Sequence, residues 1–411
     1  MNPWPIVIAD LRHLRWVAWA VPLLVAIAVA IGVAVGAQER ALRTSSARAA
    51  DDFDLLIGAP GSQTQLVLTS VYLQPEAMTL IDGAVLKALG GDSRVAAAAP
   101  IGFGDSVRGY PVIGTTRDFA TRWGRVPPSE GRLFQAQTEA VIGADVTFAL
   151  GEQITPSHGV GEHRSPLGVE TPDEHQHRHE GFHYTVTGRL PRLGSPWDRA
   201  ILVPIESVWE LHGLGTGHVR DDALLGPPFD AEHVPGVPAI VVKPKSVAAA
   251  YALRGQYRQG GTMALFPAEV LVSIYRTMGD IRDALVIISG LNNALVFIAT
   301  ILLLVAMAGL RRKRYAVLRA LGAPRVYVLL AVWLQTMLLL AGGAMAGLVL
   351  AFAATKVAAM AVEASTGLHL AVTIGASDLT FVAALIGLGS LLGLVPALIS
   401  YRTPVSTALR G

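Results

Sequence analysis

Four segments of the chain carry no charged residue over a length that can cross a lipid bilayer. They are residues 16–37, 284–310, 326–355 and 379–400. A helix needs roughly 20 apolar residues to span the hydrocarbon core, and backbone groups in lipid must form their hydrogen bonds within the protein. The sequence therefore predicts an α-helical membrane protein with four transmembrane helices.

The first segment has a second interpretation, as a secretory signal peptide. Arg12 and Arg15 precede it, and Val35–Ala37 resembles a small-residue cleavage site. Its 22 uncharged residues exceed the roughly 7–15 of a signal-peptide core. That length favours a helix that is retained in the mature protein.

Basic residues near the ends of the segments predict the orientation. The loop "RRKRYAVLRALGAPR", residues 311–325, contains six basic residues and no acid, whereas residues 38–283 contain 22 basic and 28 acidic residues. Lysine and arginine are enriched on the cytoplasmic side. We expect a multi-pass protein of the bacterial inner (cytoplasmic) membrane, with both termini and the 311–325 loop in the cytoplasm.

Three regions follow from this topology. Residues 1–37 are the cytoplasmic N-terminus and transmembrane helix 1, residues 38–283 an inserted extracytoplasmic domain, and residues 284–411 a permease domain with helices 2–4. In the insert, "FDLLIGAPG", "QLVLTSVYL" and "GFHYTVTGRL" predict strands. "AMTLIDGAVLKALGG" predicts a helix, and two stretches, "RAILVPIESVWELHGL" and "VPAIVVKPKSVAAAYALRGQY", predict a strand followed by a helix. The fold class is therefore four transmembrane helices plus an α+β extracytoplasmic domain.

Composition excludes several kinds of chemistry. The chain has no cysteine, which rules out disulfides and thiolate metal ligands. A formal charge of +2, without a basic stripe, argues against a nucleic-acid partner. The sequence "G-x-x-x-x-G-K-[ST]" is absent, so the chain has no phosphate loop for ATP.

Six of the eleven histidines fall in one part of the insert, residues 158–183. Carboxylates flank them, and neutral imidazole is a common zinc ligand. One interpretation is a loop that binds zinc or a similar ion weakly; the other is a solvated acidic loop that is rich in histidine. The candidate metal ligands are His158, His163, His175, His177, His179 and His183.

The basic loop predicts a short amphipathic helix over residues 311–323. Tyr315, Leu318 and Leu321 recur at a spacing of three residues, Gly322 suits a left-handed C-terminal cap, and Pro324 prevents continuation. Such a helix can anchor on anionic lipid headgroups or dock a cytoplasmic partner. The candidate docking residues are Tyr315, Leu318, Arg319, Leu321 and Gly322.

The residues from 311 to 351 and the end of the chain resemble MacB/FtsX/LolC-type ABC transporter permeases. The stretch "GLVPALISYRTPVSTALRG" is similar to the closing signature of that family. Where the family often has an acidic residue after the basic run, this chain has Arg314. The residues that match the closing signature are Gly393, Pro396, Ala397, Pro404, Ala408, Leu409 and Arg410.

The resemblance implies a membrane permease subunit that is not itself an enzyme. A separate cytoplasmic ATPase subunit would use the ATP and dock on the 311–323 helix, and the permease would work as a homodimer or as one of a pair. It would bind no cofactor directly, apart from weak zinc, and would drive export or extraction of an extracytoplasmic substrate such as a lipoprotein, a lipid or a metal-linked molecule. The alternative is an FtsX-like signalling permease that activates a periplasmic partner, with the histidine-rich loop as a metal sensor.

Overall fold

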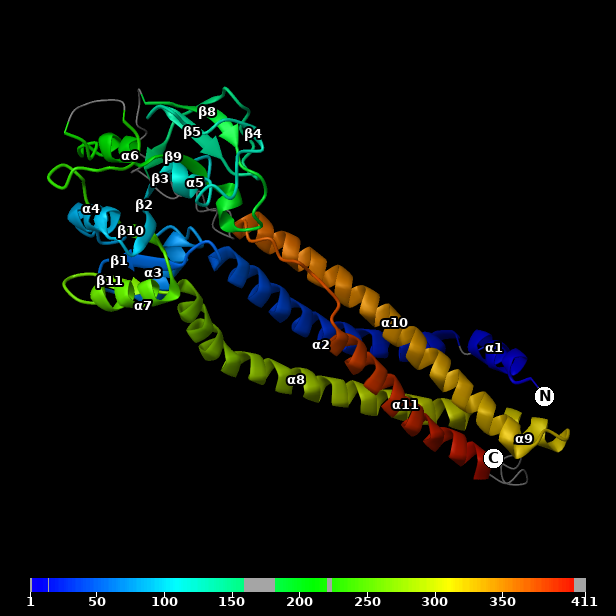
Figure 1. Ribbon diagram of the computed structural model, residues 1–411. Helices are drawn as coiled ribbons and strands as arrows, with labels where there is room; N and C mark the ends of the chain where they lie inside the picture. Colours follow the sequence, from blue (N-terminus) through cyan, green and yellow to red (C-terminus); the bar gives the residue numbers. More distant parts are fainter. Residues whose placement is uncertain (1, 14, 159–181, 220–223, 403–411) are drawn as a thin grey trace. The chain divides into compact units, whose positions relative to one another are not determined.

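The computed structural model describes residues 2–13, 15–158, 182–219 and 224–402, and divides the chain into two compact units (Figure 1). The first, which we call the membrane unit, comprises Met1–Leu42, Met278–Ala361 and Leu370–Gly411. The second, the inserted unit, comprises Arg43–Thr277 and Val362–His369. The boundaries at 42/43, 277/278 and 361/362 all fall inside helices.

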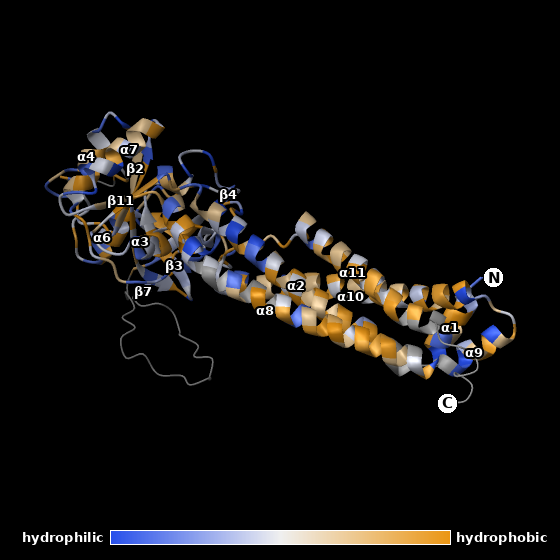
Figure 2. Cartoon of the chain, turned by 90° about the horizontal axis from the view of Figure 1, so that it is seen from below, coloured by the Kyte–Doolittle hydropathy of each residue, from blue (hydrophilic) through white to orange (hydrophobic). Residues whose placement is uncertain are grey.

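The described helices that build the membrane unit include four long and apolar enough to cross a bilayer, through Trp19–Ala50, Gly290–Met307, Arg325–Thr366 and Ala376–Val395. Figure 2 shows hydrophobic residues along these helices and hydrophilic residues on α9. Together with the α+β inserted unit, they confirm the predicted fold class. The helices are α1 (Trp4–His13), α2 (Arg15–Ala50), α8 (Pro267–Leu310), α9 (Arg312–Ala320), α10 (Arg325–Thr366) and α11 (Ala376–Arg402).

Three of the long helices continue well beyond the uncharged segments that predicted them. Helix α2 runs 13 residues past Ala37, α8 begins 17 residues before residue 284, and α10 runs 11 residues past Thr355. Absence of charge delimits what can lie in hydrocarbon, whereas a helix that has already formed extends at little cost through polar residues. Charge patterning therefore locates the spans and not the helix ends.

Glycines let the membrane helices approach closely. A Cβ added to Gly343 of α10 would lie 2.7 Å from the carbonyl oxygen of Pro22, and one added to Gly347 would lie 2.6 Å from that of Ala26. The backbones of α2 and α10 are thus in contact at a GxxxG pair. The second GxxxG pair, Gly389 and Gly393 of α11, instead faces α10 side chains of Leu340 and Thr336.

In the described part of the inserted unit, eleven strands form one sheet, in the order β11-β1-β10-β2-β3-β9-β5-β8-β4, with β6 beside β8 and β7 beside β2. The long strand β2 joins two halves, because its first residues pair with β10 and its last pair with β3. The strands are β1 (Leu55–Gly58), β2 (Val95–Val107), β3 (Tyr110–Thr115), β4 (Glu130–Gly131), β5 (Glu139–Ile142), β6 (Gln153–Ile154), β7 (Ser157–His158), β8 (Tyr184–Arg189), β9 (Ile201–Pro204), β10 (Ala239–Pro244) and β11 (Met263–Leu265).

Short helices pack against the two halves of the sheet. Figure 1 shows α6 beside β9 and α7 beside β11, and a continuous core of Val, Ile, Leu and aromatic side chains fills the interior. The helical segments are α3 (Gln63–Ser70), α4 (Gly83–Gly91), α5 (Arg117–Ala120), the 3-10 helix η1 (Pro196–Arg199), α6 (Ile205–Leu211) and α7 (Val247–Gln256).

One local prediction in the insert is wrong. The stretch "QLVLTSVYL" was expected to be a strand, but its first six residues lie in helix α3, whose first turn is capped by the Ser62 hydroxyl accepting from the Gln65 N–H at 3.2 Å. A short apolar run fits either periodicity, and the cap decides for the helix. The other expected strands, and the helices at α4, α6 and α7, occur where the sequence predicted them.

The last turn of α10 and the residues just after it, Val362–His369, belong to the inserted unit. An Arg199 guanidinium N–H donates to the Ala364 carbonyl at 2.7 Å, and Arg192 lies 3.3 Å from Glu363. The His369 ring nitrogen Nδ1 is 2.7 Å from the same Glu363 carboxylate. The sequence presented this segment as a short loop between membrane helices, and its packing partners came from the tertiary structure alone.

Candidate functional site

Helix α9 forms where the basic loop predicted it. It begins after Arg311 and ends at Ala320, and Gly322 takes the left-handed backbone conformation (φ +100°). The N–H groups of Gly322 and Ala323 donate to the carbonyls of Arg319 and Leu318. These bonds satisfy carbonyls at the end of the helix, so the short helix ends at a defined residue.

The predicted docking residues divide between two faces of α9. Tyr315 is 4% exposed and packs with Val328, Val332 and Ala397, and Leu318 is partly buried against the same cluster. Leu321 is 80% exposed and Gly322 is exposed, while Arg319 is intermediate. The side chain of Tyr315 is thus buried by contacts within the chain, whereas the side chain of Leu321 is accessible to a partner.

Val317 was not among the docking residues predicted from the sequence. It is 48% exposed and lies four residues before Leu321, so the two share a face of the helix. Lys313 and Arg314 are also exposed. The accessible surface of α9 is therefore two apolar side chains beside basic ones, and the i, i+4 spacing of Val317 and Leu321 was the signal that could have indicated it.

A buried polar cluster lies behind α9. The carboxylate of Asp10, on α1, is 3.4 Å from Arg311 Nη1, 3.5 Å from Arg314 Nη1 and 3.1 Å from the Tyr315 hydroxyl. Arg311 also donates to the side-chain oxygen of Gln335 on α10. Burial raises the pKa of Tyr315 to about 12, so its hydroxyl keeps its proton and donates to Asp10 at neutral pH. Arg314, which stands where the family often has an acid, thus lies near a carboxylate within its own chain.

The candidate zinc ligands lie mostly outside the described residues. This applies to His163, His175, His177 and His179. The backbone of His158 lies in β7, opposite Asp105 of β2, and the exposed His183 is 2.7 Å from the Thr155 hydroxyl. Within the described residues, no group of three or more His, Asp or Glu side chains is arranged to hold a metal ion.

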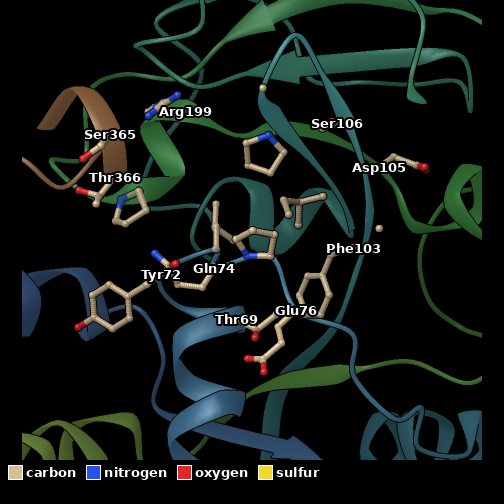
Figure 3. A pocket seen from close by; sticks show the side chains of 17 residues that line it. Thr69, Tyr72, Gln74, Glu76, Phe103, Asp105, Ser106, Arg199, Ser365 and Thr366 are labelled. Carbon is tan, nitrogen blue, oxygen red and sulfur yellow. The ribbon is translucent and has the colours of Figure 1, made fainter. Parts of the chain in front are cut away.

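A cavity of about 260 Å³ lies in the inserted unit beside the β2–β3 hairpin, and we call it the hairpin cavity (Figure 3). Four segments far apart in the sequence form it, which is why no local motif predicted it. The lining residues are Thr69, Tyr72, Leu73, Gln74, Pro75, Glu76, Phe103, Gly104, Asp105, Ser106, Gly109, Pro111, Ile113, Pro196, Arg199, Ser365 and Thr366.

Its wall combines apolar rings with a few polar groups. Thr69 is 2% exposed, and its hydroxyl has no hydrogen-bond partner. Leu73 adopts a positive φ of 54°, and the pairing of β2 with β3 is interrupted between Gly102 and Asp105. Strained backbone and bulges concentrate at binding sites. A small molecule with an apolar body and one or two polar groups fits this chemistry.

A second cavity, of about 640 Å³, lies where the last turns of α2 meet the first turns of α8, and we call it the helix-end cavity. Phe53, Phe266 and Leu271 give it apolar walls, and Arg43 and Arg276 add two cations. Burial raises the pKa of Asp54, which also lines it. This larger cavity can accommodate an amphipathic molecule.

The architecture defines a class of protein, and one family model matches the C-terminal region. Four membrane-length helices and an inserted α+β unit define the architecture of a multi-pass membrane protein. Residues 286–405 match the FtsX-like permease C-terminal family. This match covers the C-terminal region, and it confirms there the resemblance to MacB/FtsX/LolC-type permeases that the sequence predicted.

Two solved structures are similar to the chain. One is the periplasmic region of MacB from Actinobacillus actinomycetemcomitans, at 10% identity and a TM-score of 0.33, covering 55% of this chain and 94% of that one. The other is the extracellular domain of the ABC-type transporter YknZ from Gram-positive bacteria, at 12% identity and a TM-score of 0.29, covering 51% of this chain and 98% of that one. A comparison with curated protein sequences finds no match.

Proposed function

We propose that the chain is the membrane permease subunit of an ABC transporter, which couples ATP hydrolysis by a separate cytoplasmic ATPase to work on an extracytoplasmic substrate. The main support is α9. It is a basic helix in a region of the FtsX-like permease family, with two exposed apolar side chains, in a chain whose sequence lacks a phosphate loop. A permease of this kind would work as a homodimer or with a second permease.

The orientation belongs to the same proposal. The basic loop 311–325 would face the cytoplasm and the acidic insert 38–283 the other side. Because the chain has no cysteine, single cysteines at Ala323 and at the exposed Val247 can be labelled without background. An impermeant thiol reagent should label only Val247→Cys in intact spheroplasts. Labelling of Ala323→Cys alone would reverse the topology.

ATPase docking can be tested on the exposed face of α9. Leu321→Asp and Val317→Asp place a charge on that face without touching the buried Tyr315 cluster. Both should prevent co-purification of the ATPase, and Val247→Asp, at a residue 75% exposed in the inserted unit, is the matched control. If the ATPase co-purified equally with all three variants, α9 would not be its docking site.

The two cavities favour export or extraction over signalling. A signalling permease needs a surface for a partner protein, whereas the hairpin and helix-end cavities are concave sites of about 260 and 640 Å³ that suit a small molecule. Mass spectrometry of the protein purified in native lipid particles should detect a co-purifying small amphipathic molecule. Its loss in Leu271→Trp, which fills the helix-end cavity, would assign the site. A periplasmic protein retained equally by that variant would support the signalling alternative.

Weak zinc binding by the histidine-rich loop stays a proposal that rests on the sequence. A ligand histidine must be neutral, so affinity should fall as the pH drops through about 6.5. Calorimetry should compare the wild-type protein with a variant in which His175, His177, His179 and His183 are all alanine. Equal zinc binding by the two proteins would leave only a solvated loop.

A further inference from the structure

The N-terminus of helix α9 carries an unfavourable concentration of positive charge. The amide groups of a first turn carry a partial positive charge, which acidic residues usually offset. The first turn of α9 contains no acid: Arg311 precedes the helix, which then begins with Arg312, Lys313 and Arg314. In isolation such a helix would be poorly stabilised at the end where it follows the membrane span α8.

A carboxylate from α1 supplies the negative charge that the first turn of α9 lacks. Asp10 is 7% exposed, and its carboxylate contacts Arg311, Arg314 and the Tyr315 hydroxyl. One carboxylate thus lies close to two cations, Arg311 just before the helix and Arg314 in its first turn, and accepts a hydrogen bond from the neutral Tyr315 hydroxyl. Because the Arg311 side chain is 3% exposed, it can find little other compensation in water.

The same contacts set the rotation of α9 about its axis. The bond from Tyr315 to Asp10, together with packing on Val328 and Val332, turns the Tyr315 face inward. Val317 and Leu321 consequently point away from the chain. The residues just before α1 are held at a second point, since the Tyr327 hydroxyl of α10 donates to the Asn2 carbonyl at 3.1 Å.

We propose that Asp10 is a positioning residue for the ATPase-docking helix: from α1 it supplies the negative charge that α9 lacks and holds the Val317–Leu321 face toward the ATPase. This inference rests on the proposed function of α9. It assigns the N-terminal helix a role in coupling, and it predicts that a neutral side chain at position 10 loosens α9 without unfolding the bundle.

The chain offers a matched control in the same unit. Asp378, at the start of α11, is 4% exposed and pairs with Arg40 of α2. This second buried ion pair does not contact α9 or α1 through any described interaction. Asp378→Asn therefore removes a buried carboxylate of the same kind without touching the docking helix.

The experiment uses the full chain in lipid nanodiscs, with a spin label on Val317→Cys as the only cysteine. Asp10→Asn should increase the mobility of the label, while Asp10→Glu and Asp378→Asn should leave it unchanged. In protein without the Val317→Cys change or the label, and with the ATPase added, Asp10→Asn should reduce permease-stimulated ATP hydrolysis by about five- to 150-fold, the range of typical coupling effects. Asp378→Asn should leave stimulation within about twofold, below that range.

The outcomes separate the two proposals. Unchanged label mobility in Asp10→Asn overturns the role of Asp10, whatever the ATPase does. Increased mobility, in a protein whose wild-type form stimulates no ATPase, supports the positioning role and contradicts the proposed function. If Asp10→Asn does not yield folded protein, Tyr315→Phe removes one hydrogen bond to Asp10 and should still raise the mobility of the label.

Discussion

Different interactions stabilise the inside of the membrane unit and the inside of the inserted unit. In the membrane unit, α2 and α10 touch backbone to backbone at Gly343 and Gly347, while many large apolar side chains, such as Leu295 and Leu302 of α8, point outward. In the inserted unit, the apolar side chains of one sheet and its helices are buried together. Lipid is as apolar as the side chains, so burial drives folding only in the inserted unit.

Buried charges also differ between the two units. In the membrane unit, the ion pairs Asp10–Arg311 and Arg40–Asp378 involve residues outside the uncharged segments. In the inserted unit, Arg122 is 1% exposed inside an aromatic cluster, 4.4 Å from the Trp197 ring and 4.6 Å from the Phe119 ring. An aqueous-side domain can solvate the partner Asp52, which is 27% exposed, whereas hydrocarbon offers no such compensation.

The largest expected effect tests the glycine contact in the membrane unit. A leucine side chain at both Gly343 and Gly347 would force α2 and α10 apart, because their Cβ atoms alone would lie under 3 Å from the α2 backbone. We expect a loss of about 2 kcal/mol at each site, typical of overpacking. Thermal unfolding in detergent measures it. Gly342→Leu is the control, since nothing lies within 4 Å of a Cβ there; equal melting of the two proteins would contradict the close contact.

The second prediction concerns the buried arginine of the inserted unit. Arg122 donates to Asp52 at 3.1 Å and to the Phe119 carbonyl at 3.0 Å. Arg122→Met removes both bonds and the stacking on Trp197, and should destabilise the unit by about 3 kcal/mol. Arg125→Met should cost under about 1 kcal/mol, because Arg125 also binds Asp52 but is 56% exposed. Denaturant unfolding followed by tryptophan fluorescence measures the stability of the two variants. Similar losses of stability in both would mean that burial does not set the contribution of Arg122.

The stability of the inserted unit should depend on pH through Glu206. Burial raises the pKa of Glu206 from 4.5 to about 7, so the folded state holds a proton that the unfolded state releases. Stability from this group is present below pH 4.5 and is lost as the pH rises toward 7, by on the order of 3 kcal/mol. Burial lowers the pKa of the neighbouring His218, which gives an opposite slope.

The difference between wild type and Glu206→Gln isolates the contribution of Glu206. Glutamine can still accept from the Gly226 N–H, which Glu206 accepts at 2.6 Å. The variant should gain stability relative to wild type as the pH rises from 5 to 8. The pH series, read by tryptophan fluorescence near Trp209, would go against this account if the two proteins kept a constant difference.

The smallest effect sharpens the comparison between exposed and buried ion pairs. Arg254 and Glu269 form two parallel bonds of 2.9 and 2.7 Å, but Glu269 is 50% exposed. Glu269→Gln should cost under about 1 kcal/mol. A loss in denaturant unfolding as large as that of Arg122→Met would remove the distinction between the two kinds of pair.

Much of the architecture was predictable because it depends on local chemistry. Uncharged length located the four spans, basic residues and the Gly322–Pro324 pair located α9 and its end, and strand–helix patterns located β9 with α6 and β10 with α7. Each of these signals acts over a few residues or over one turn. The failure at α3 has the same origin, since its apolar run fits two periods and only the Ser62 cap distinguishes them.

The sequence by itself determined which segments are helical and apolar, and which short helix carries the basic residues. Only the tertiary structure decided which face of that helix is free. From the sequence, Tyr315 and Leu321 are equally plausible docking residues. In the structure Tyr315 is 4% exposed, because Asp10 and α10 cover it, whereas Leu321 is 80% exposed. The hairpin cavity, formed from four distant segments, was unpredictable for the same reason. Burial is a property of packing between segments, and no periodicity within one segment encodes its partner.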